Sequence, residues 1–354
     1  MKIRIAGIVA GLLLMFGVST GVAAEADLWK FLWAQEGNGD QIHYRPESVH
    51  LLETNQLGVI YRAELISFWS IPMRNKIAEE MNLPGEVKEK FFRSEAGIAY
   101  EVEMDMSRWQ YRIQRVGYVA DRKSEKVTWT GAGRGEWRSL MGNEMGEPLA
   151  TLAIRIYQDR GEIQKRPKQS IDLTTLPKIQ KSLELPWIEF DQTSWGRYFF
   201  LPSELKVISS SEKGSEQFQV LVRSDWTLRA RKEAPEAENA VRISEKRKPI
   251  EGLNQTDQDY MIWSFDFSDQ KRSYLAGAYL TEDKKVVHQE GAFAEDKKVV
   301  HQEGAFAEAG WSPWETPMNP GAIAAYLLAN PQFIPTKGAE DGKVEVPQVW
   351  SGKK

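Results

Sequence analysis

Residues 59–65 read VIYRAEL, and residues 220–226 read VLVRSDW. Apolar side chains alternate with polar ones in both stretches, a pattern typical of a β-strand that buries one face. A slip of one residue would turn such a strand inside out, so the shared phase indicates two related strands. Their numbering differs by an offset of 161 (220 − 59), which predicts that a long part of the chain is repeated.

Further landmarks keep the same order in both halves of the chain. Residues 100–106 alternate apolar and acidic side chains, and residues 261–267 place Met, Trp, Phe and Phe at the apolar positions. Met106 and Phe267 are therefore expected in their cores, with Asp105 and Asp266 on the solvent face. We predict a first domain at 25–158, a linker at 159–184, a second domain at 185–330 and a loose tail at 331–354.

Each repeat begins with strands and ends with a helix signal. Trp29, Phe31 and Trp33 alternate with other residues, which predicts a strand that buries these rings. Pro148 suits the first helical position and leads into Leu149, Leu152, Ala153 and Ile156 on one face. The predicted fold class is α+β, with two tandem domains, each an antiparallel β-sheet with a C-terminal helix packed on one face.

The second repeat shows the same ending. Ile323, Tyr326 and Leu327 are spaced for one helix face, and Asn330-Pro331 ends the run. Trp137 is paired with Trp314 as a landmark before the helix. The repeats differ in the middle, because residues 71–91 look helical whereas 228–250 form a charged run, interpreted as a solvated and mobile insertion.

A shorter repeat is exact. Residues 282–294 read EDKKVVHQEGAFA, and residues 295–307 repeat them without a change. Two perfect adjacent copies are typical of a recent slippage duplication, which explains most of the extra length of the second domain. The duplication alone brings His288 and His301 into similar surroundings, so a metal site is only an alternative interpretation.

The N-terminus has the pattern of a secretory signal. Lys2 and Arg4 precede an apolar run, and Val22-Ala23-Ala24 offers small residues before a cut. We therefore predict a signal peptide at 1–24 and an exported protein in the periplasm, at the cell surface or outside the cell. No later stretch is long and apolar enough for a further membrane span.

The composition excludes several classes of protein. Cleavage after Ala24 leaves 44 basic and 50 acidic residues, a net charge of −6, which argues against nucleic-acid binding. Cysteine is absent, so there are no disulfides, thiolate metal sites or cysteine nucleophiles. The 13 tryptophans must help to build the cores instead.

Catalytic and cofactor motifs are missing. The four histidines form no metal-binding helix pair, and His43 is expected at the surface. Residues 130–135 are rich in glycine but lead into Glu136-Trp137 rather than a helix, which favours a turn over a phosphate site. We predict no enzyme activity, no catalytic residue, no cofactor and no metal site.

The order of these landmarks resembles the surface-adhesin protein E family. The resemblance is carried by Tyr44-Arg45-Pro46-Glu47-Ser48-Val49, the strands at 59–65 and 100–112, Tyr118, and the Trp137 segment before a helix. It implies small exported domains with a β-sheet and a C-terminal helix. Family members often carry two cysteines, and Met106, Phe267, Ala153 and Ala325 resemble apolar replacements for them.

The sequence leads to three hypotheses about function. The first is a non-catalytic cell-envelope or surface protein that binds an extracellular or envelope protein, as the resemblance implies. The second is a structural or stress-linked periplasmic protein without a host ligand. The third is a small-ligand binding module with a tryptophan-lined groove. The motifs name no binding residue and no oligomeric state.

Overall fold

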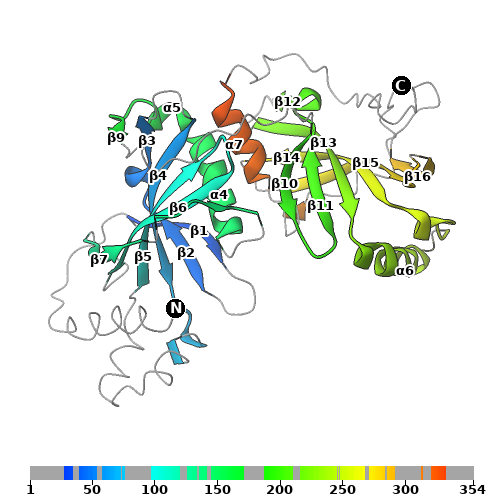
Figure 1. The fold of residues 1–354 in the computed structure, drawn as a ribbon, viewed down its shortest axis with the longest axis horizontal. Coiled ribbons are helices and arrows are strands. Elements are labelled where there is room, and N and C mark those ends of the chain that lie inside the picture. Colours follow the sequence, from blue (N-terminus) through cyan, green and yellow to red (C-terminus); the bar gives the residue numbers. More distant parts are fainter. Residues whose placement is uncertain are drawn as a thin grey trace. The chain divides into compact units, whose positions relative to one another are not determined.

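The chain folds into two mostly antiparallel β-sheets with helices, as a computed structural model shows (Figure 1). The structure describes residues 28–34, 40–53, 58–72, 74–75, 97–119, 126–133, 135–141, 145–170, 187–209, 216–244, 246, 248–267, 271–283, 285–291, 312–313 and 320–331. The predicted signal peptide and tail lie outside these residues, except for Pro331. No helix among the described residues has the length and apolar character to span a membrane.

The first sheet has its strands in the order β1-β2-β4-β5-β6-β7, with β3 and β8 pairing with β4 and β6. Its strands are β1 (Lys30–Ala34), β2 (Gln41–Tyr44), β3 (His50–Glu53), β4 (Ile60–Phe68), β5 (Gly97–Asp105), β6 (Gln110–Val119), β7 (Thr128–Ala132) and β8 (Arg138–Ser139). A 3-10 helix, η1 (Pro46–Ser48), links β2 to β3, and helix α4 (Gly146–Gln158) follows the strands and lies beside β1.

The second sheet has the order β10-β11-β13-β14-β15-β16, with β12 on β13 and β17 on β15. Its strands are β10 (Ile188–Gln192), β11 (Gly196–Phe200), β12 (Lys206–Ser209), β13 (Glu216–Trp226), β14 (Gln258–Asp266), β15 (Lys271–Leu280), β16 (Val286–Gly291) and β17 (Ser312–Pro313). The helical elements that follow β11 along the chain are η3 (Pro202–Glu204), α6 (Leu228–Ser244), η4 (Leu253–Gln255) and α7 (Gly321–Ala329).

The two sheets share one strand order, although a further strand of the first sheet, β9 (Gln169–Ser170), has no counterpart among the described strands of the second, and two of the three register shifts in each sheet match. The pairing of β1 with β2 shifts between Phe31 and Trp33, and that of β10 with β11 shifts between Glu189 and Asp191. A second shift lies between Glu101 and Val102 in β5 and between Ile262 and Trp263 in β14. Because a β-bulge is a specific local feature, its recurrence at equivalent places supports common descent.

The pairing corrects the predicted alignment of one strand. Tyr61 pairs with Met104, and Phe218 pairs with Phe265, the equivalent of Met104 in the second repeat. Tyr61 is thus equivalent to Phe218, at an offset of 157 (218 − 61), so the offset of 161 predicted for this strand is wrong by four. Four is an even number, and the strand period is two, so the predicted faces are still correct.

The pairing also changes which tryptophan of the second repeat corresponds to Trp137. Gln110 pairs with Ser139 in the first sheet, and Lys271 pairs with Pro313 in the second. The offset from Ser139 to Pro313 is 174, whereas the offset from Gln110 to Lys271 is 161, and the difference equals the length of one copy of the exact repeat. The residue of the second repeat that is equivalent to Trp137 is therefore Trp311 rather than Trp314. Both Trp311 and Trp314 lie outside the described residues.

The chain divides into two compact units. The first comprises residues 1–179 with Ala324–Ala329, and the second comprises 180–323 with 330–354. Most of α7 is thus grouped with the first unit, so its predicted packing on the second sheet stays a prediction. The segment predicted as a linker contributes α5 (Arg160–Ile163) and β9 (Gln169–Ser170) to the first unit, where β9 pairs in parallel with β3.

The first sheet has buried residues on both faces. Tyr61, Ala63 and Leu65 are buried on the predicted face, but Ile60 and Ile66 are also buried on the opposite one. The four residues expected to share the buried face of α4, namely Leu149, Leu152, Ala153 and Ile156, are all buried. A sheet with two covered faces does not show a clean division into buried and solvent-exposed positions.

This two-sided burial explains one error of the sequence analysis. Met106 and Phe267 are buried as predicted, but Asp105 and Asp266 are buried as well and do not lie on a solvent face. The Asp105 carboxylate accepts hydrogen bonds from the backbone N–H groups of Ser107 and Arg108 and pairs with the Arg108 guanidinium. Burial raises the pKa of Asp105, and the contacts with Arg108 oppose this rise.

Strand β1 and the charged insertion also differ from expectation. Trp29 and Leu32 are buried, whereas Phe31 is 53% exposed, because the bulge after Phe31 shifts the alternation. The run at 228–250, expected as a solvated and mobile insertion, contains a regular element, since Leu228–Ser244 form α6, which buries Ala230, Pro235 and Arg242. The helix predicted at 71–91 begins at Ile71 and then leaves the described residues.

We expect Asp105→Ala to lower the free energy of unfolding of the first unit by about 1–3 kcal/mol, because buried donors lose their acceptor. Lys165→Ala, at a side chain that is 70% exposed, is the control and should change it by less than about 0.5 kcal/mol. Urea unfolding, with hydrogen exchange to report on each unit, measures both changes. Equal effects would contradict the buried role of Asp105.

Candidate functional site

One face of the first sheet carries rows of charged side chains, and we call it the arginine face. Arg62 of β4 pairs with Glu103 of β5, which pairs in turn with Arg112 of β6. Glu64 and Glu101 are paired in the same way on these strands, next to Arg115. Because paired residues of antiparallel strands point to the same side, these residues form two neighbouring rows.

The first row is centred on the buried carboxylate of Glu103. Its oxygens accept hydrogen bonds from Arg62 Nε at 3.1 Å, Arg112 Nε at 2.6 Å and Gln114 Nε2 at 2.9 Å. The Arg62 guanidinium also donates to Gln169 Oε1 of β9 at 3.2 Å. Two arginines around one buried carboxylate leave a positive charge in the row, and each group is stable there only while its partners remain.

The second row is more open to solvent. Arg115 Nε donates to Glu101 Oε1 at 3.1 Å, and the Arg115 side chain is 45% exposed. At the other end of the row, Arg45 forms an ion pair with Glu64 at 3.4 Å. These pairs fix the guanidinium groups in position while leaving part of their surface accessible.

Two tryptophans cover the outer edge of the arginine face. The Arg115 guanidinium lies 4.5 Å from the ring centre of Trp129, and that of Arg112 lies 4.7 Å from Trp137. Such stacking holds a guanidinium flat against the ring. Arginine and tryptophan are among the residues most enriched at the energetic centres of protein interfaces, so this arrangement is suited to binding.

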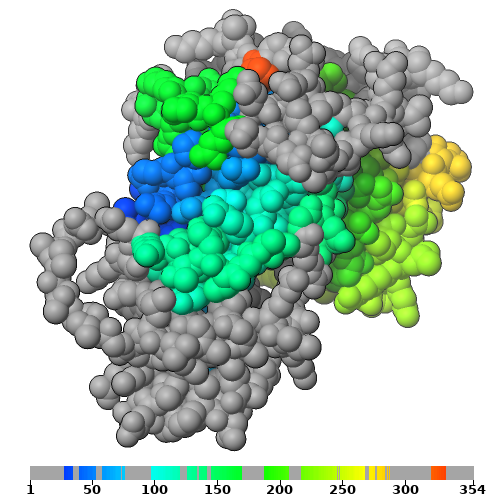
Figure 2. Space-filling model, turned by 60° about the vertical axis from the view of Figure 1, so that its left-hand side comes forward, coloured from blue at the N-terminus to red at the C-terminus, as the bar shows by residue number. Residues whose placement is uncertain are grey.

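Part of this segment of the chain reaches the molecular surface. The strands β5 to β7 appear in cyan and turquoise on the face shown in Figure 2. Strand β7 ends the order of strands on this side, and its residues from Thr130 to Ala132 are exposed. The tryptophan–arginine stack of the second row therefore lies at the β7 end of the described order of strands.

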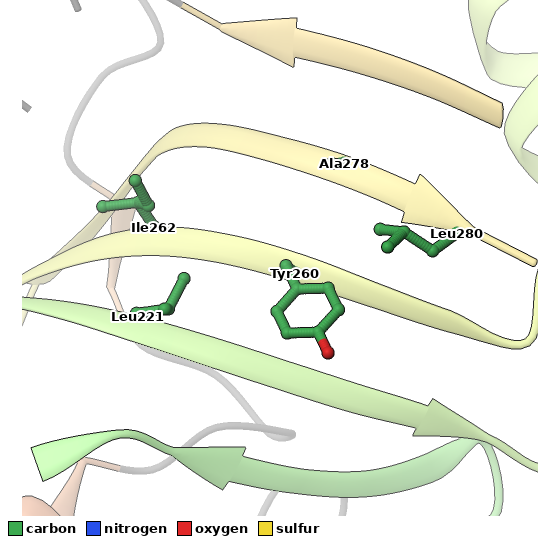
Figure 3. Close-up of a cluster of buried hydrophobic side chains, with 5 residues drawn as sticks. All are labelled: Leu221, Tyr260, Ile262, Ala278 and Leu280. Carbon is green, nitrogen blue, oxygen red and sulfur yellow. The ribbon is translucent and has the colours of Figure 1, made fainter. Parts of the chain in front are cut away.

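The equivalent face of the second sheet has lost these charges. The positions of Arg62, Glu103 and Arg112 are occupied by Gln219, Ser264 and Ser273. The positions of Glu64 and Glu101 are occupied by Leu221 and Ile262, which pack with Tyr260, Ala278 and Leu280 in a buried apolar cluster (Figure 3). The same strands thus support an ionic network in one sheet and an apolar core in the other.

Charges appear elsewhere on the second sheet, nearer its β10 edge. Arg197 pairs with Glu189, and Arg223 pairs with Asp225 at 3.0 Å. The Arg223 guanidinium lies 4.4 Å from the ring centre of Phe199. The first sheet is apolar at the places equivalent to Glu189, Arg223 and Asp225, so the polar and apolar parts of the face are exchanged between the sheets; these places hold Phe31, Ile66 and Phe68.

The histidines form no cluster with other metal-ligating residues in the described part of the chain. His43, expected at the surface, is only 5% exposed and lies between the rings of Phe31 and Phe68, at 5.6 and 5.1 Å. Burial lowers the pKa of His50. The side chains of His288 and His301 lie outside the described residues.

The glycine-rich segment, predicted to be a turn, instead continues strand β7 along β6. Residues 130–132 belong to β7, and Gly133 N donates to Gln114 O at 2.7 Å, which continues the pairing with β6. A Cβ atom at Gly133 would lie 1.8 Å from Ile113 O, so only glycine fits. Strand β8 follows instead of a helix, so the backbone offers no helix N-terminus to a phosphate group.

A carboxyl group with an unusual environment lies in the second unit. Asp259 pairs with Ser224, and the side chains of Ser224 and Trp226 donate hydrogen bonds to its carboxyl group. Its Oδ1 is buried and has no hydrogen-bond partner among the described residues. Burial raises the pKa of Asp259 to about 7, and the neighbouring Asp225 adds to the rise.

A small cavity lies between the first sheet and α4–α5. Its volume of about 10 Å³ has room for about one water molecule, and it is lined by Tyr44, Pro46, Val49, Arg155, Ile156, Asp159, Ile163 and Arg166. Sites for small ligands usually measure about 300–1,000 Å³. This cavity is smaller and contains no tryptophan, so it does not match the predicted tryptophan-lined groove.

Comparisons with protein-family models, with curated proteins and with solved structures found no match to this chain.

The arginine face was missed in the sequence because its charged residues were assigned to solvent. A signal was nevertheless present, since Glu101 and Glu103 alternate on one strand and Arg112 and Arg115 lie on the next. Opposite charges on the same face of adjacent strands predict paired rows.

We expect Glu103→Gln to lower the free energy of unfolding of the first unit by about 3–5 kcal/mol, because Arg112 loses its buried counter-ion. Arg112 is only 2% exposed, so water cannot replace the carboxylate without opening the sheet. Glu162→Gln is a matched control on an ion pair whose side chains are 73% and 70% exposed. Urea unfolding measures both variants, and a cost below about 1 kcal/mol for Glu103→Gln would contradict this role.

Asp259 is expected to make the second unit less stable as the pH rises. Its pKa of about 7 in the folded chain lies above the value of about 3.9 for an aspartate in an unfolded chain. The folded state binds the proton more tightly, so the stabilisation is complete below about pH 4 and is lost as the pH rises through 7. Asp259→Asn should flatten this dependence in urea unfolding between pH 4 and 8, and an unchanged slope would contradict it.

Proposed function

We propose that this chain is an exported, non-catalytic protein of the cell envelope that binds a protein partner through the arginine face of its first domain. The observation that carries the proposal is the Arg115 guanidinium, which pairs with Glu101, stacks on Trp129 and is 45% exposed. Fixed aromatic and arginine side chains lose little conformational freedom on binding, which favours their use at interfaces.

The proposal includes the domain organisation expected from the sequence. Two related domains in tandem, each with a terminal helix packed on its sheet, are supported by the matching strand orders and the matching bulges. The resemblance to the surface-adhesin protein E family suggests the same arrangement and an exported location. Common descent also explains why the interior positions keep their character while the arginine face does not.

The distribution of charge favours binding over catalysis. Glu103 and Glu101 are both engaged by arginines, which suits them for holding guanidinium groups rather than for transferring protons. Asp259, whose pKa lies near 7, has a buried carboxyl group and lies far along the chain from these residues. We therefore assign the charged rows of the first domain to binding of the protein partner.

Cell fractionation tests the location. The mature protein should be found outside the cytoplasm, with a mass that corresponds to a chain beginning at Glu25. A full-length protein in the cytoplasm would overturn the proposal. A periplasmic protein that cross-links to no partner in intact cells would favour the structural or stress-linked alternative.

Cross-linking in intact cells tests the surface itself. The double variant Arg115→Ala/Trp129→Ala should reduce cross-linking to the main partner at least tenfold, because it removes a hot-spot pair of about 2 kcal/mol or more. The matched control is Arg229→Ala, since Arg229 stacks on Trp195 at 4.8 Å in the second unit. Equal losses in both variants, with both proteins folded, would contradict recognition by the first domain.

A further inference from the structure

Two arginines of the second sheet, Arg197 and Arg223, lie on one face near the β10 end of the strand order, and we call them the arginine pair. Arg197 and Phe199 belong to β11, where Phe199 lies opposite Arg223 of β13 and Arg197 lies opposite Asp225. Paired residues, and residues two apart on one strand, point to the same side of a sheet. The arginine pair therefore occupies diagonal positions on β11 and β13, which are neighbouring strands (Figure 1).

One aromatic ring fixes the spacing of the two guanidinium groups. The ring centre of Phe199 lies 5.2 Å from the guanidinium of Arg197 and 4.4 Å from that of Arg223. The Arg223 guanidinium also lies 5.0 Å from the ring centre of Trp187. Stacking of this kind holds a guanidinium against the ring. The two positive charges are thus held at fixed positions on the face.

Each arginine of the pair binds a carboxylate through one side of its guanidinium only. Arg197 Nε donates to Glu189 Oε1 at 2.9 Å, and Arg197 Nη2 donates to the other oxygen. Arg223 Nε lies 3.0 Å from Asp225 Oδ1, and its Nη2 donates to Oδ2 at 3.2 Å. Nη1 has no partner among the described residues in either arginine. The side formed by Nη1 and Nη2 can therefore bind a second carboxylate.

The arginine pair reaches solvent without forming a strongly positive patch. The side chain of Arg197 is 54% exposed, and that of Arg223 is 20% exposed. Glu189 and Asp225 balance the two positive charges. A patch without net charge does not attract polyanions over long distances, so a ligand must match the positions of the two guanidinium groups.

The spacing of the pair matches that of an extended peptide. Residues at diagonal positions of neighbouring strands lie about 7–8 Å apart. In an extended chain, residues two apart lie about 7 Å apart and point to the same side, whereas adjacent residues point to opposite sides. An extended segment with acidic residues at alternate positions can therefore place one carboxylate on each guanidinium.

We propose that the arginine pair binds an extended acidic segment of a protein partner, with one carboxylate of the segment on Arg197 and the next on Arg223. Each carboxylate accepts two parallel hydrogen bonds from Nη1 and Nη2, which is the geometry that arginine offers and lysine does not. This surface is separate from the arginine face of the first domain and does not depend on the function proposed for that face.

Peptides of equal charge test the spacing with the unmodified chain. The probes are fluorescein-labelled peptides of sequence GGEGEGG, GGEEGGG and GGQGQGG, and fluorescence anisotropy measures their binding to the full chain. The alternating peptide GGEGEGG should bind at least about tenfold more tightly than GGEEGGG, because only alternate side chains reach both arginines. The uncharged peptide should show no saturable binding.

Variants of the chain test the two arginines. Arg197→Gln/Arg223→Gln should weaken binding of GGEGEGG at least about tenfold, and Arg197→Lys/Arg223→Lys should weaken it about as much, because lysine keeps the charge but not the paired donors. Arg229→Gln is the matched control, since Arg229 is also 54% exposed, pairs with Glu233 and stacks on Trp195, but belongs to α6. It should leave the affinity unchanged. Urea unfolding verifies that each variant is folded.

Several results would overturn the proposal. Absence of saturable binding at millimolar GGEGEGG, or equal affinity for GGEEGGG, would show that the pair does not recognise alternate carboxylates. Unchanged affinity in the folded Gln variant would place the peptide elsewhere, and wild-type affinity in the Lys variant would reduce the effect to charge alone. An equal loss in Arg229→Gln would do the same. Displacement of the peptide by oligogalacturonate at an equal concentration of carboxylates would assign the surface to an acidic polysaccharide instead.

Discussion

The two-residue period of a β-strand is the constraint on which both sheets depend. It assigns each residue of β4, β5 and β6 to one of two faces, and both faces of the first sheet contain buried residues. A charged residue on such a strand must therefore find a partner on the same face of a neighbouring strand. Glu103 does so with Arg62 and Arg112, and the alternation brings Glu101 and Arg115 together beside them.

The sequence was sufficient for features that depend on this period. The buried faces of Tyr61, Ala63 and Leu65, and of Met106 and Phe267, follow from alternation, and the error of four in the offset between β4 and β13 did not change them. The sequence was insufficient where the period is interrupted or where both faces are covered. The bulge at Phe31 exposes a ring expected inside, and pairing with Arg108 allows Asp105 to be buried.

The candidate site was harder to predict than the fold because its residues are also structural. A carboxylate such as Glu103 looks like a solvated residue in the sequence, and only the register with β4 and β6 shows that two arginines surround it. The second sheet shows that the fold does not require these charges, since Ser264 and Leu221 occupy equivalent places in it.

Parity also explains where one exact copy of the short repeat can be accommodated. The length of the copy is an odd number, so the same insertion within β14 would move the side chains that follow it to the opposite face of the sheet and take Phe265 off its buried face. The insertion follows β16 instead, and the pairing of β17 with β15 resumes beyond it. Strand β16 has one neighbour among the described strands, so a duplication that follows it leaves every described inner register unchanged.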